Sequence, residues 1–208
     1  MIELLFATRN AHKTAEIRKI LGPQFQVNDL ADHPEIPHIA ETGKTFEDNA
    51  ILKAVTVSKH IPGFVVADDS GLEVDALDGA PGIYSARYAG PAASDNEKIE
   101  KLLEELGRVG APKDVHRARF HCVLALARKG EVLGMFEGLV EGQIANRPQG
   151  SHGFGYDPIF IPNGFQQTFA ELEPAKKNQL SHRARALEKL GGFLILRPKQ
   201  KSDGDIPS

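Results

Sequence analysis

Two spacings of hydrophobic residues alternate along the chain and predict an α/β protein. Short apolar runs, such as 2–7 and 64–67, are typical of buried strands, and apolar residues spaced by three and four are typical of helices. Strands are expected at 2–7, early in 25–40, at 64–67, 119–126, 132–136, 139–144 and 193–196, and helices at 10–21, 46–60, 95–106 and from Ser181 to about 192. This order of elements predicts a central mixed β-sheet flanked by helices.

Side chains that can cap helices stand where the helical spacing begins. The candidates are Asn10, Thr45 with Asp48, Ser94 with Glu97, and Ser181. A Ser or Thr followed three residues later by an acidic side chain is a capping signature. The glycine pair 191–192 is expected to end the last helix.

The composition fits one domain and limits what it can bind. The 208 residues carry a net charge of −3, so a broad basic surface for nucleic acid is not indicated. No apolar run is long enough to span a membrane, and the N-terminus does not resemble a secretory signal. Cys122 is the single cysteine and stands among apolar residues, which favours a buried, unreactive thiol in a reducing compartment. We expect one cytoplasmic domain at 1–197 and a disordered tail at 198–208.

The candidate chemistry gathers first at residues 64–90. The predicted strand 64–67 is followed at once by two carboxylates, Asp68 and Asp69, and then by Ser70. Carboxylates at the end of a buried strand lie where α/β sheets place their ligands. Successive strand side chains point to opposite faces, so one Asp can face a cleft and the other the scaffold. The following stretch to residue 90 is rich in Gly and Pro, and we expect it to be irregular and to shape a site.

A second candidate lies where the first strand meets the first helix. The run from Thr8 to Lys13 offers backbone N–H groups at a helix N-terminus, polar side chains and an ammonium group. This combination suits a polyphosphate. The segment alone nevertheless favours the plainer interpretation, in which Asn10 only caps the helix and Lys13 is solvated.

Two further segments could contact a nucleobase. Glycines flank Phe154 in the loop 150–158, so its ring could stand clear of the backbone as a stacking platform, although a core position is the commoner role of a Phe. His182 and Arg183 lie in the first turn of the last helix, where cations oppose the helix dipole. Their placement there suggests a bound anion or a base carbonyl, and Lys177 nearby points the same way.

Several blocks together resemble a known family. The segments ATRNAHK (7–13), ETGKTFEDNAILKA (41–54), DDSGLEVDALDGAPGIYSARYAG (68–90), FGYDPIF (154–160) and KNQLSHR (177–183) closely resemble the inosine triphosphate pyrophosphatases of the Ham1 type. The resemblance runs from about residue 3 to about 196. One departure is His152, which stands where many members of the family have a small residue.

The resemblance implies two lobes around a nucleotide-binding cleft and a Mg²⁺-dependent enzyme. Such an enzyme hydrolyses ITP, dITP and XTP to the monophosphate and pyrophosphate. The implied metal ligands are Glu41 and Asp69, with Asp69 also orienting the attacking water; Asp68 could share these duties. The implied substrate-binding residues are Thr8, Arg9, Asn10, Ala11, His12, Lys13, Lys53, Ser70, Phe154, Gly155, Tyr156, Asp157, Lys177, His182 and Arg183. Of these, Lys13, Lys53 and Lys177 are expected to hold phosphates. The resemblance also implies a homodimer, because the family is typically homodimeric.

The residues also suggest how the base could be chosen. Hypoxanthine and xanthine carry an acceptor at C6 and a donor at N1, and adenine carries the reverse. Arg183 or His182 near C6 and Asp157 near N1 would therefore fit the deaminated bases. Guanine also carries an acceptor at C6 and a donor at N1, so these residues do not distinguish it from the deaminated bases. Two other functions stay open, a pyrophosphatase acting on other modified bases and a nucleotide-binding protein without catalysis.

Overall fold

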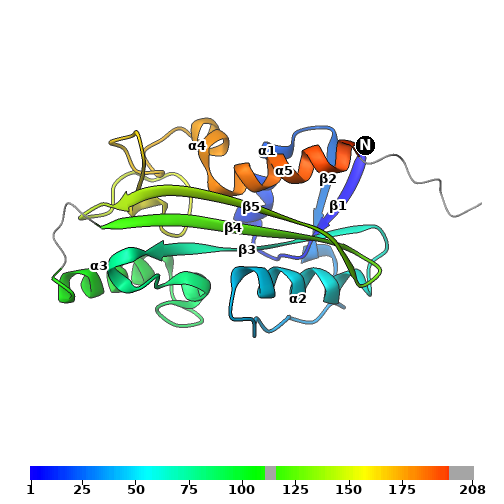
Figure 1. Ribbon diagram of the computed structural model, residues 1–208, viewed down its shortest axis with the longest axis horizontal. Helices are drawn as coiled ribbons and strands as arrows, with labels where there is room; N and C mark the ends of the chain where they lie inside the picture. The colour runs from blue at the N-terminus through cyan, green and yellow to red at the C-terminus, as the bar shows by residue number, and fades with distance from the viewer. Residues whose placement is uncertain (111–115, 197–208) are drawn as a thin grey trace, which may run out of the picture.

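Six strands form one mixed sheet in the computed structural model, which describes residues 1–110 and 116–196 (Figure 1). The spatial order is β2-β1-β3-β4-β5-β6. The strands are β1 (Ile2–Phe6), β2 (Phe25–Asp29), β3 (Phe64–Val74), β4 (Arg117–Arg128), β5 (Glu131–Ile144) and β6 (Phe160–Pro162). β1 is parallel to both β2 and β3, whereas β3, β4, β5 and β6 pair antiparallel. The α/β class and the mixed sheet predicted from the sequence are thus confirmed.

Helices cover both faces of this sheet. α1 and α5 lie over one face and α2 lies over the other, with α3 near the far end of β3 (Figure 1). The helices are α1 (Ala11–Leu21), α2 (Phe46–Ser58), α3 (Asp95–Arg108), α4 (Pro174–Leu180) and α5 (His182–Leu196), with 3-10 turns η1 (Leu30–Asp32), η2 (Asp75–Leu77), η3 (Gly82–Arg87) and η5 (Asp157–Ile159). No helix in these described ranges is long and apolar enough to cross a membrane.

The predicted caps are present. The Asn10 side chain accepts hydrogen bonds from the backbone of His12 and Lys13, and Ser94 and Glu97 form a complete capping box. The Thr45 hydroxyl accepts from Asp48, and Ser181 Oγ accepts from the backbone N–H of Ala184. Each cap satisfies a backbone donor that the helix leaves without an internal partner.

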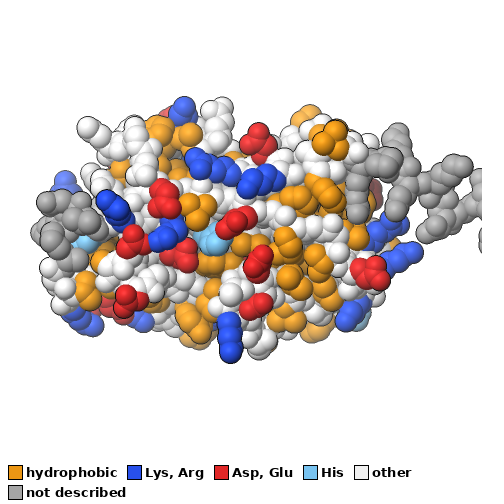
Figure 2. Space-filling view, viewed as in Figure 1, with side chains coloured by type: hydrophobic (Ala, Val, Ile, Leu, Met, Phe, Trp, Pro, Cys, Tyr) orange, Lys and Arg blue, Asp and Glu red, His pale blue; other side chains and the backbone are white. Residues whose placement is uncertain are grey.

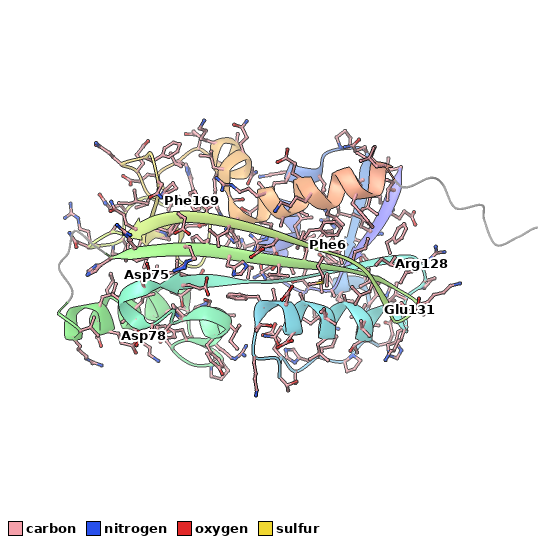
Figure 3. The ribbon with its side chains drawn as sticks, viewed as in Figure 1. Phe6, Asp75, Asp78, Arg128, Glu131 and Phe169 are labelled. Carbon is pink, nitrogen blue, oxygen red and sulfur yellow. The ribbon has the colours of Figure 1, made fainter. Side chains whose placement is uncertain are left out.

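Within the described part of the chain the core consists of three apolar clusters, two of which lie on opposite faces of the sheet. One contains Phe6 and Leu187 and lies between the sheet and α1 and α5, and another contains Ala50 and Val65 and lies under α2. The third contains Leu102 and Phe169 and lies toward the end of the sheet that bears α3. Figure 3 shows Phe6 near the middle of the sheet, and Phe169 toward the end of the molecule opposite the β4–β5 turn marked by Arg128 and Glu131.

The first correction concerns β3. It does not end at residue 67 but continues to Val74, so Asp68 and Asp69 lie within a strand rather than after one. The antiparallel partner β4 pairs with it as far as Val74 opposite Ala118. That partner lies about fifty residues away in the sequence, so local patterning could not show how far the strand runs. After the end of β3, the stretch that was predicted to be irregular contains a 3-10 turn, η3, at Gly82–Arg87.

Two further corrections concern glycines. The strands expected at 132–136 and 139–144 are one strand, β5, which passes through Gly138. A Cβ at Gly138 would lie 2.0 Å from the carbonyl oxygen of His182, so this glycine serves the close approach of α5. The predicted last strand at 193–196 is wrong, because α5 passes through Gly191 and Gly192 and its Phe193 packs against Phe136. β6 and α4 were not predicted, and the predicted tail at 198–208 lies outside the described residues.

Candidate active site

The candidate site lies where β3 extends beyond the end of β1, its parallel neighbour in the sheet. β1 pairs with β3 only from Leu4 to Phe6, opposite Phe64 to Val66. The next residues of β3 remain paired with β4 on one side, while on the other side they meet the first residues of α1. Asp68 and Asp69 therefore lie at a sheet edge beside a helix N-terminus, and their side chains point to opposite faces, as the strand alternation predicts.

Asp68 is fully occupied by protein partners. Its Oδ1 accepts from Lys13 Nζ at 2.5 Å and from the Ser70 hydroxyl at 2.8 Å, and its Oδ2 accepts from Arg183 Nε at 2.7 Å. Burial raises the pKa of Asp68, but Arg183 and Lys13 outweigh burial and hold the pKa well below its usual range. A carboxylate so strongly stabilised in its charged form is a weak base, so Asp68 is the poorer candidate for activating water.

Asp69 faces α2 and shares an ammonium with Glu41. Lys53 Nζ lies 2.7 Å from Asp69 Oδ1, 2.8 Å from Glu41 Oε1 and 2.9 Å from the carbonyl oxygen of Asp68. Asn49 donates to the other oxygen of Asp69, and Arg87 donates to the other oxygen of Glu41. Two carboxylates and one cation, all at least partly buried, thus meet at one point.

The two carboxylates differ in acidity. Burial raises the pKa of Glu41, but Lys53 and Arg87 outweigh burial and lower the pKa to about 2. For Asp69, burial is the larger effect and is reinforced by the nearby Glu41 charge, so its pKa is raised despite the Lys53 contact. A carboxylate with a raised pKa accepts a proton more readily, which suits Asp69 to the role of a general base.

The same pair could hold a divalent cation. Glu41 and Asp69 already converge on one positive charge, the Lys53 ammonium, and their oxygens are the hard ligands that Mg²⁺ prefers. No group of three or more metal-ligating His, Cys, Asp or Glu side chains occurs within residues 1–110 and 116–196. Mg²⁺ usually takes one or two carboxylates and completes its shell with phosphate oxygens and water, so this donor set fits it.

Some residues of the run from Thr8 to Lys13 line a cavity, and others hold the surrounding backbone in place. Asn10, His12 and Lys13 line a cavity of about 240 Å³ that also reaches Ser70 and the Phe154 loop. The Thr8 hydroxyl accepts from the backbone N–H of Asn10 and so shapes the turn before Ala11. Arg9 instead donates to the carbonyl oxygens of His33 and Ile36, so it fastens the segment after β2.

Phe154 stands in this cavity as a half-buried ring close to an imidazole and two cations. The His12 ring stacks on it with centroids 5.8 Å apart, and Lys177 Nζ and the Arg183 guanidinium carbon lie 5.0 Å and 5.7 Å from its centroid. Phe154 is absent from the three apolar core clusters that the structure describes, so the sequence alternative of a core side chain is not favoured.

Asp157 and Lys177 lie beside the Phe154 ring. Lys177 Nζ donates to Asp157 Oδ2 at 2.6 Å and lies 3.1 Å from Glu16 Oε1, and the backbone N–H of Phe154 donates to the same Asp157 oxygen. Burial raises the pKa of Asp157, and Lys177 opposes this. The Tyr156 hydroxyl donates to the carbonyl of Ser85, which fixes the far side of the loop.

His182 is not the cation that the sequence suggested. Burial lowers its pKa well below the usual value, and the charges of Arg183 and Lys177 lower it further, so the ring is neutral at neutral pH. Its ring stacks on Phe120 with centroids 4.7 Å apart, and Nδ1 is a buried atom without a hydrogen-bond partner among the described residues. A buried polar atom with no partner, on a cavity wall, is available to a ligand.

Arg183 is buried and joins two helices to β3. Its guanidinium donates to Asp68, to Ser70 Oγ and to Glu16, which lies in α1. Sequence reasoning missed Glu16, and the available signal was its place beside Ile17 on the inward face of α1. It also missed Asn49 and Arg87, which hold the outer oxygens of the Asp69–Glu41 pair.

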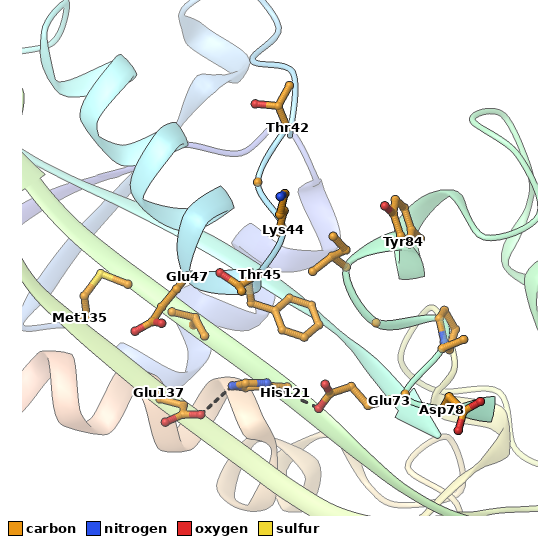
Figure 4. Close-up of a pocket in the computed structure, with 18 of the residues that line it drawn as sticks. Thr42, Lys44, Thr45, Glu47, Glu73, Asp78, Tyr84, His121, Met135 and Glu137 are labelled. Carbon is orange, nitrogen blue, oxygen red and sulfur yellow. Dashed lines mark ion pairs between the residues drawn. The ribbon is translucent and has the colours of Figure 1, made fainter. Parts of the chain in front are cut away.

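A larger cavity, of about 950 Å³, lies elsewhere on the sheet (Figure 4). At its floor His121 Nε2 lies 2.7 Å from Glu137 Oε1, and His121 Nδ1 lies 3.7 Å from Glu73 Oε2. The space-filling view shows acidic side chains gathered around a histidine near the middle of the face it presents (Figure 2). The lining includes the acidic Glu47, Glu73, Asp78 and Glu137 but, of Lys and Arg, only Lys44 among the described residues. A polyphosphate would be repelled there, so the smaller cavity is the better nucleotide site.

Comparison with known proteins finds relatives over nearly the whole described chain. Residues 4–193 match the model of the Ham1 family. A dITP/XTP pyrophosphatase of Shouchella clausii is 50% identical over 190 residues, covering 91% of this chain and 95% of that protein. A dITP/XTP pyrophosphatase of Bacillus subtilis is 49% identical over 195 residues, covering 93% of this chain and 98% of that protein.

Solved structures show the same fold. The structure of a HAM1 protein from Coxiella burnetii matches with a TM-score of 0.84 and 42% identity, covering 95% of this chain and all of that one. The Staphylococcus aureus Ham1 protein matches with a TM-score of 0.81 and 42% identity, covering 93% and 98% of the two chains. With the family model matched over nearly the whole described chain and relatives at about half identity, this chain belongs to the Ham1 family.

Proposed function

We propose that this protein hydrolyses non-canonical purine nucleoside triphosphates, namely dITP, ITP and XTP, to the monophosphate and pyrophosphate. The reaction removes these nucleotides from the nucleotide pool. The observation that carries the proposal is the Lys53 ammonium held between Asp69 and Glu41 at the open edge of β3, next to the cavity that contains Phe154. The relatives named dITP/XTP pyrophosphatase support the choice of substrate.

The reacting end of the site uses few groups. Asp69 orients a water molecule toward the α-phosphorus and accepts its proton, which its raised pKa favours. Lys13 and Lys53 hold phosphate oxygens and stabilise the charge that develops on the leaving pyrophosphate. For this to happen their ammonium groups exchange part of their contacts with Asp68, Asp69 and Glu41 for contacts with the substrate.

We further propose that Glu41 and Asp69 hold Mg²⁺. The ion would neutralise phosphate oxygens and make the phosphorus more electrophilic. Asn49 and Arg87 orient the two carboxylates from behind, as groups that support metal ligands commonly do.

The base end of the site offers both a stacking surface and polar partners. The Phe154 ring can stack on the purine, and the neutral His182 can present a ring N–H to the C6 carbonyl. Asp157 can accept from N1–H with the oxygen that does not bind Lys177. Adenine would place an amino donor against His182 and an acceptor against Asp157, and such opposed groups are costly when buried.

Pyrophosphate release from a panel of triphosphates tests the proposal. With Mg²⁺ present, dITP, ITP and XTP should yield pyrophosphate far faster than ATP or GTP. A preference for other modified bases would favour a related pyrophosphatase, and tight binding with no release would indicate a nucleotide-binding protein without catalysis. We also expect a homodimer in the cytoplasm, a prediction that rests on the family resemblance and the composition.

A further inference from the structure

The loop that carries Phe154 is fastened from two neighbouring elements. The Gly155 N–H donates to Asp95 Oδ2 at 2.6 Å, and the Tyr156 hydroxyl donates to the Ser85 carbonyl at 3.0 Å. Gly155 has a φ of +63°, a left-handed conformation, and no atom lies within 4 Å of the place where its Cβ would be. Its glycine therefore serves the backbone conformation that turns this N–H toward Asp95.

Asp95 reaches this loop from the first turn of α3. Its other oxygen, Oδ1, accepts from Lys98 Nζ at 2.6 Å, and the Lys98 side chain is only 13% exposed. Asp95, Lys98 and Phe154 all line the 240 Å³ cavity. Burial raises the pKa of Asp95, but Lys98 and the Gly155 N–H outweigh it and lower the pKa, so the carboxylate is ionised at neutral pH.

The capping box of α3 does not use this carboxylate, which favours the helix N-terminus only through its charge. Ser94 and Glu97 already form the complete capping box of α3, so the cap does not depend on Asp95. A negative charge on the wall of a cavity for a polyanion also opposes substrate binding unless a specific contact offsets it. Here both oxygens are committed, one to the backbone next to Phe154 and one to a cation from its own helix.

From these contacts we propose that Asp95 is a positioning residue for the nucleobase. It holds the Phe154–Gly155 peptide at the height and angle at which the Phe154 ring meets the purine, and Lys98 holds Asp95 in the orientation that makes this contact. Asp95 acts through Phe154 and not on the reacting phosphates. The proposal rests on the proposed function, because it assumes that a purine occupies the cavity.

The test separates binding at the base end from binding at the phosphate end. Inosine monophosphate and inorganic pyrophosphate are titrated separately, by calorimetry, into the wild type and into Asp95→Ala, Asp95→Asn and Glu104→Ala. Asn keeps an oxygen that can accept from Gly155. Glu104 lies on the same helix, is exposed and pairs with Arg108, so its variant is the matched control. The midpoint of thermal unfolding of each variant is recorded as well.

We expect Asp95→Ala to weaken inosine monophosphate binding by roughly threefold to tenfold, less than the full worth of a charge-assisted hydrogen bond, because that bond is also present in the free protein and its loss acts on binding only through the position of Phe154. Pyrophosphate binding should stay at the wild-type value, Asp95→Asn should recover most of the loss, and Glu104→Ala should match the wild type. In turnover the change should appear in KM more than in kcat. Unchanged monophosphate binding in Asp95→Ala, or an equal loss of both ligands, would overturn the inference alone. A wild type that releases pyrophosphate from dITP without binding inosine monophosphate would also overturn the inference alone, and one that does neither would overturn the proposed function together with it.

Discussion

Replacing Arg183 by Met removes a buried charge that joins α5 to α1 and β3. The guanidinium is about 2% exposed and donates to Asp68, Glu16 and Ser70. The methionine side chain replaces the apolar stem of the arginine, so the change removes the guanidinium with its charge and hydrogen bonds and leaves the stem filled. Asp68 would keep Lys13, and Glu16 would keep Lys177, but each would lose its other cation.

The expected loss of stability is large. Removing one partner of a buried ion pair typically costs about 3–5 kcal/mol, because a charge is left in a medium that solvates it poorly. That is a large share of the roughly 5–15 kcal/mol by which domains are stable. The double variant Arg183→Met/Asp68→Asn should recover part of the loss, since it removes the more deeply buried of the two carboxylates that lose a cation.

Urea unfolding followed by circular dichroism gives these free energies, with equal denaturant dependence checked in each variant. Arg183 and Lys13 hold the pKa of Asp68 well below its usual range, so the stabilisation is present above the unfolded pKa and is lost only as pH falls through the lower, folded value. The loss in Arg183→Met should therefore be the same at about pH 6 and about pH 8. A loss below about 1 kcal/mol, the scale of surface pairs, would refute the reasoning.

Four further results are expected. In a folded His182→Ala variant kcat/KM should fall more for ITP than for ATP, because the ring N–H to the C6 carbonyl is lost, and an equal fall would mean that His182 does not take part in base choice. Phe154→Ala should weaken substrate binding by roughly 1–3 kcal/mol while the protein stays folded, and unfolding instead would show a core role. EDTA should abolish turnover and Mg²⁺ or Mn²⁺ should restore it, so dependence on zinc would contradict the ligand assignment. The Glu73 and Glu137 carboxylates raise the pKa of His121 despite its burial. The stability that the His121 charge provides is therefore complete below the pKa of the unfolded state and is lost as pH rises through the pKa of the folded state. The stability difference between the wild type and His121→Gln should shrink from about pH 6 to about pH 9, and a constant difference would exclude this linkage.

Signals between residues close in sequence predicted much of the fold. The features that they missed depend on contacts between residues far apart in sequence. Asn10 and Ser94 marked helix starts correctly, because a cap is made by residues within three positions of each other. The length of β3 was not predictable from its own residues, since its second half is held by β4. Gly138 suggested a break in a strand, yet it is glycine because the α5 backbone passes close to it.

The candidate site shows the same division. Alternation along β3 was enough to predict that Asp68 and Asp69 face opposite sides, and the family blocks supplied most of the lining residues of the small cavity. The partners could not be inferred, because Glu16 meets Arg183 only after the chain has folded across 167 positions. The neutral state of His182 likewise follows from burial, which its helical position did not show.

The most direct test of the central claim is the product mixture formed from dITP by the wild type and by Asp69→Asn. The wild type with Mg²⁺ should form dIMP and pyrophosphate in equal amounts. Asp69→Asn keeps the shape of the side chain but removes its charge, so turnover should fall by at least the roughly 10²–10⁴-fold of a lost general base while circular dichroism stays native. Release of dIDP and orthophosphate by the wild type, or near-normal turnover in a folded Asp69→Asn variant, would contradict the account.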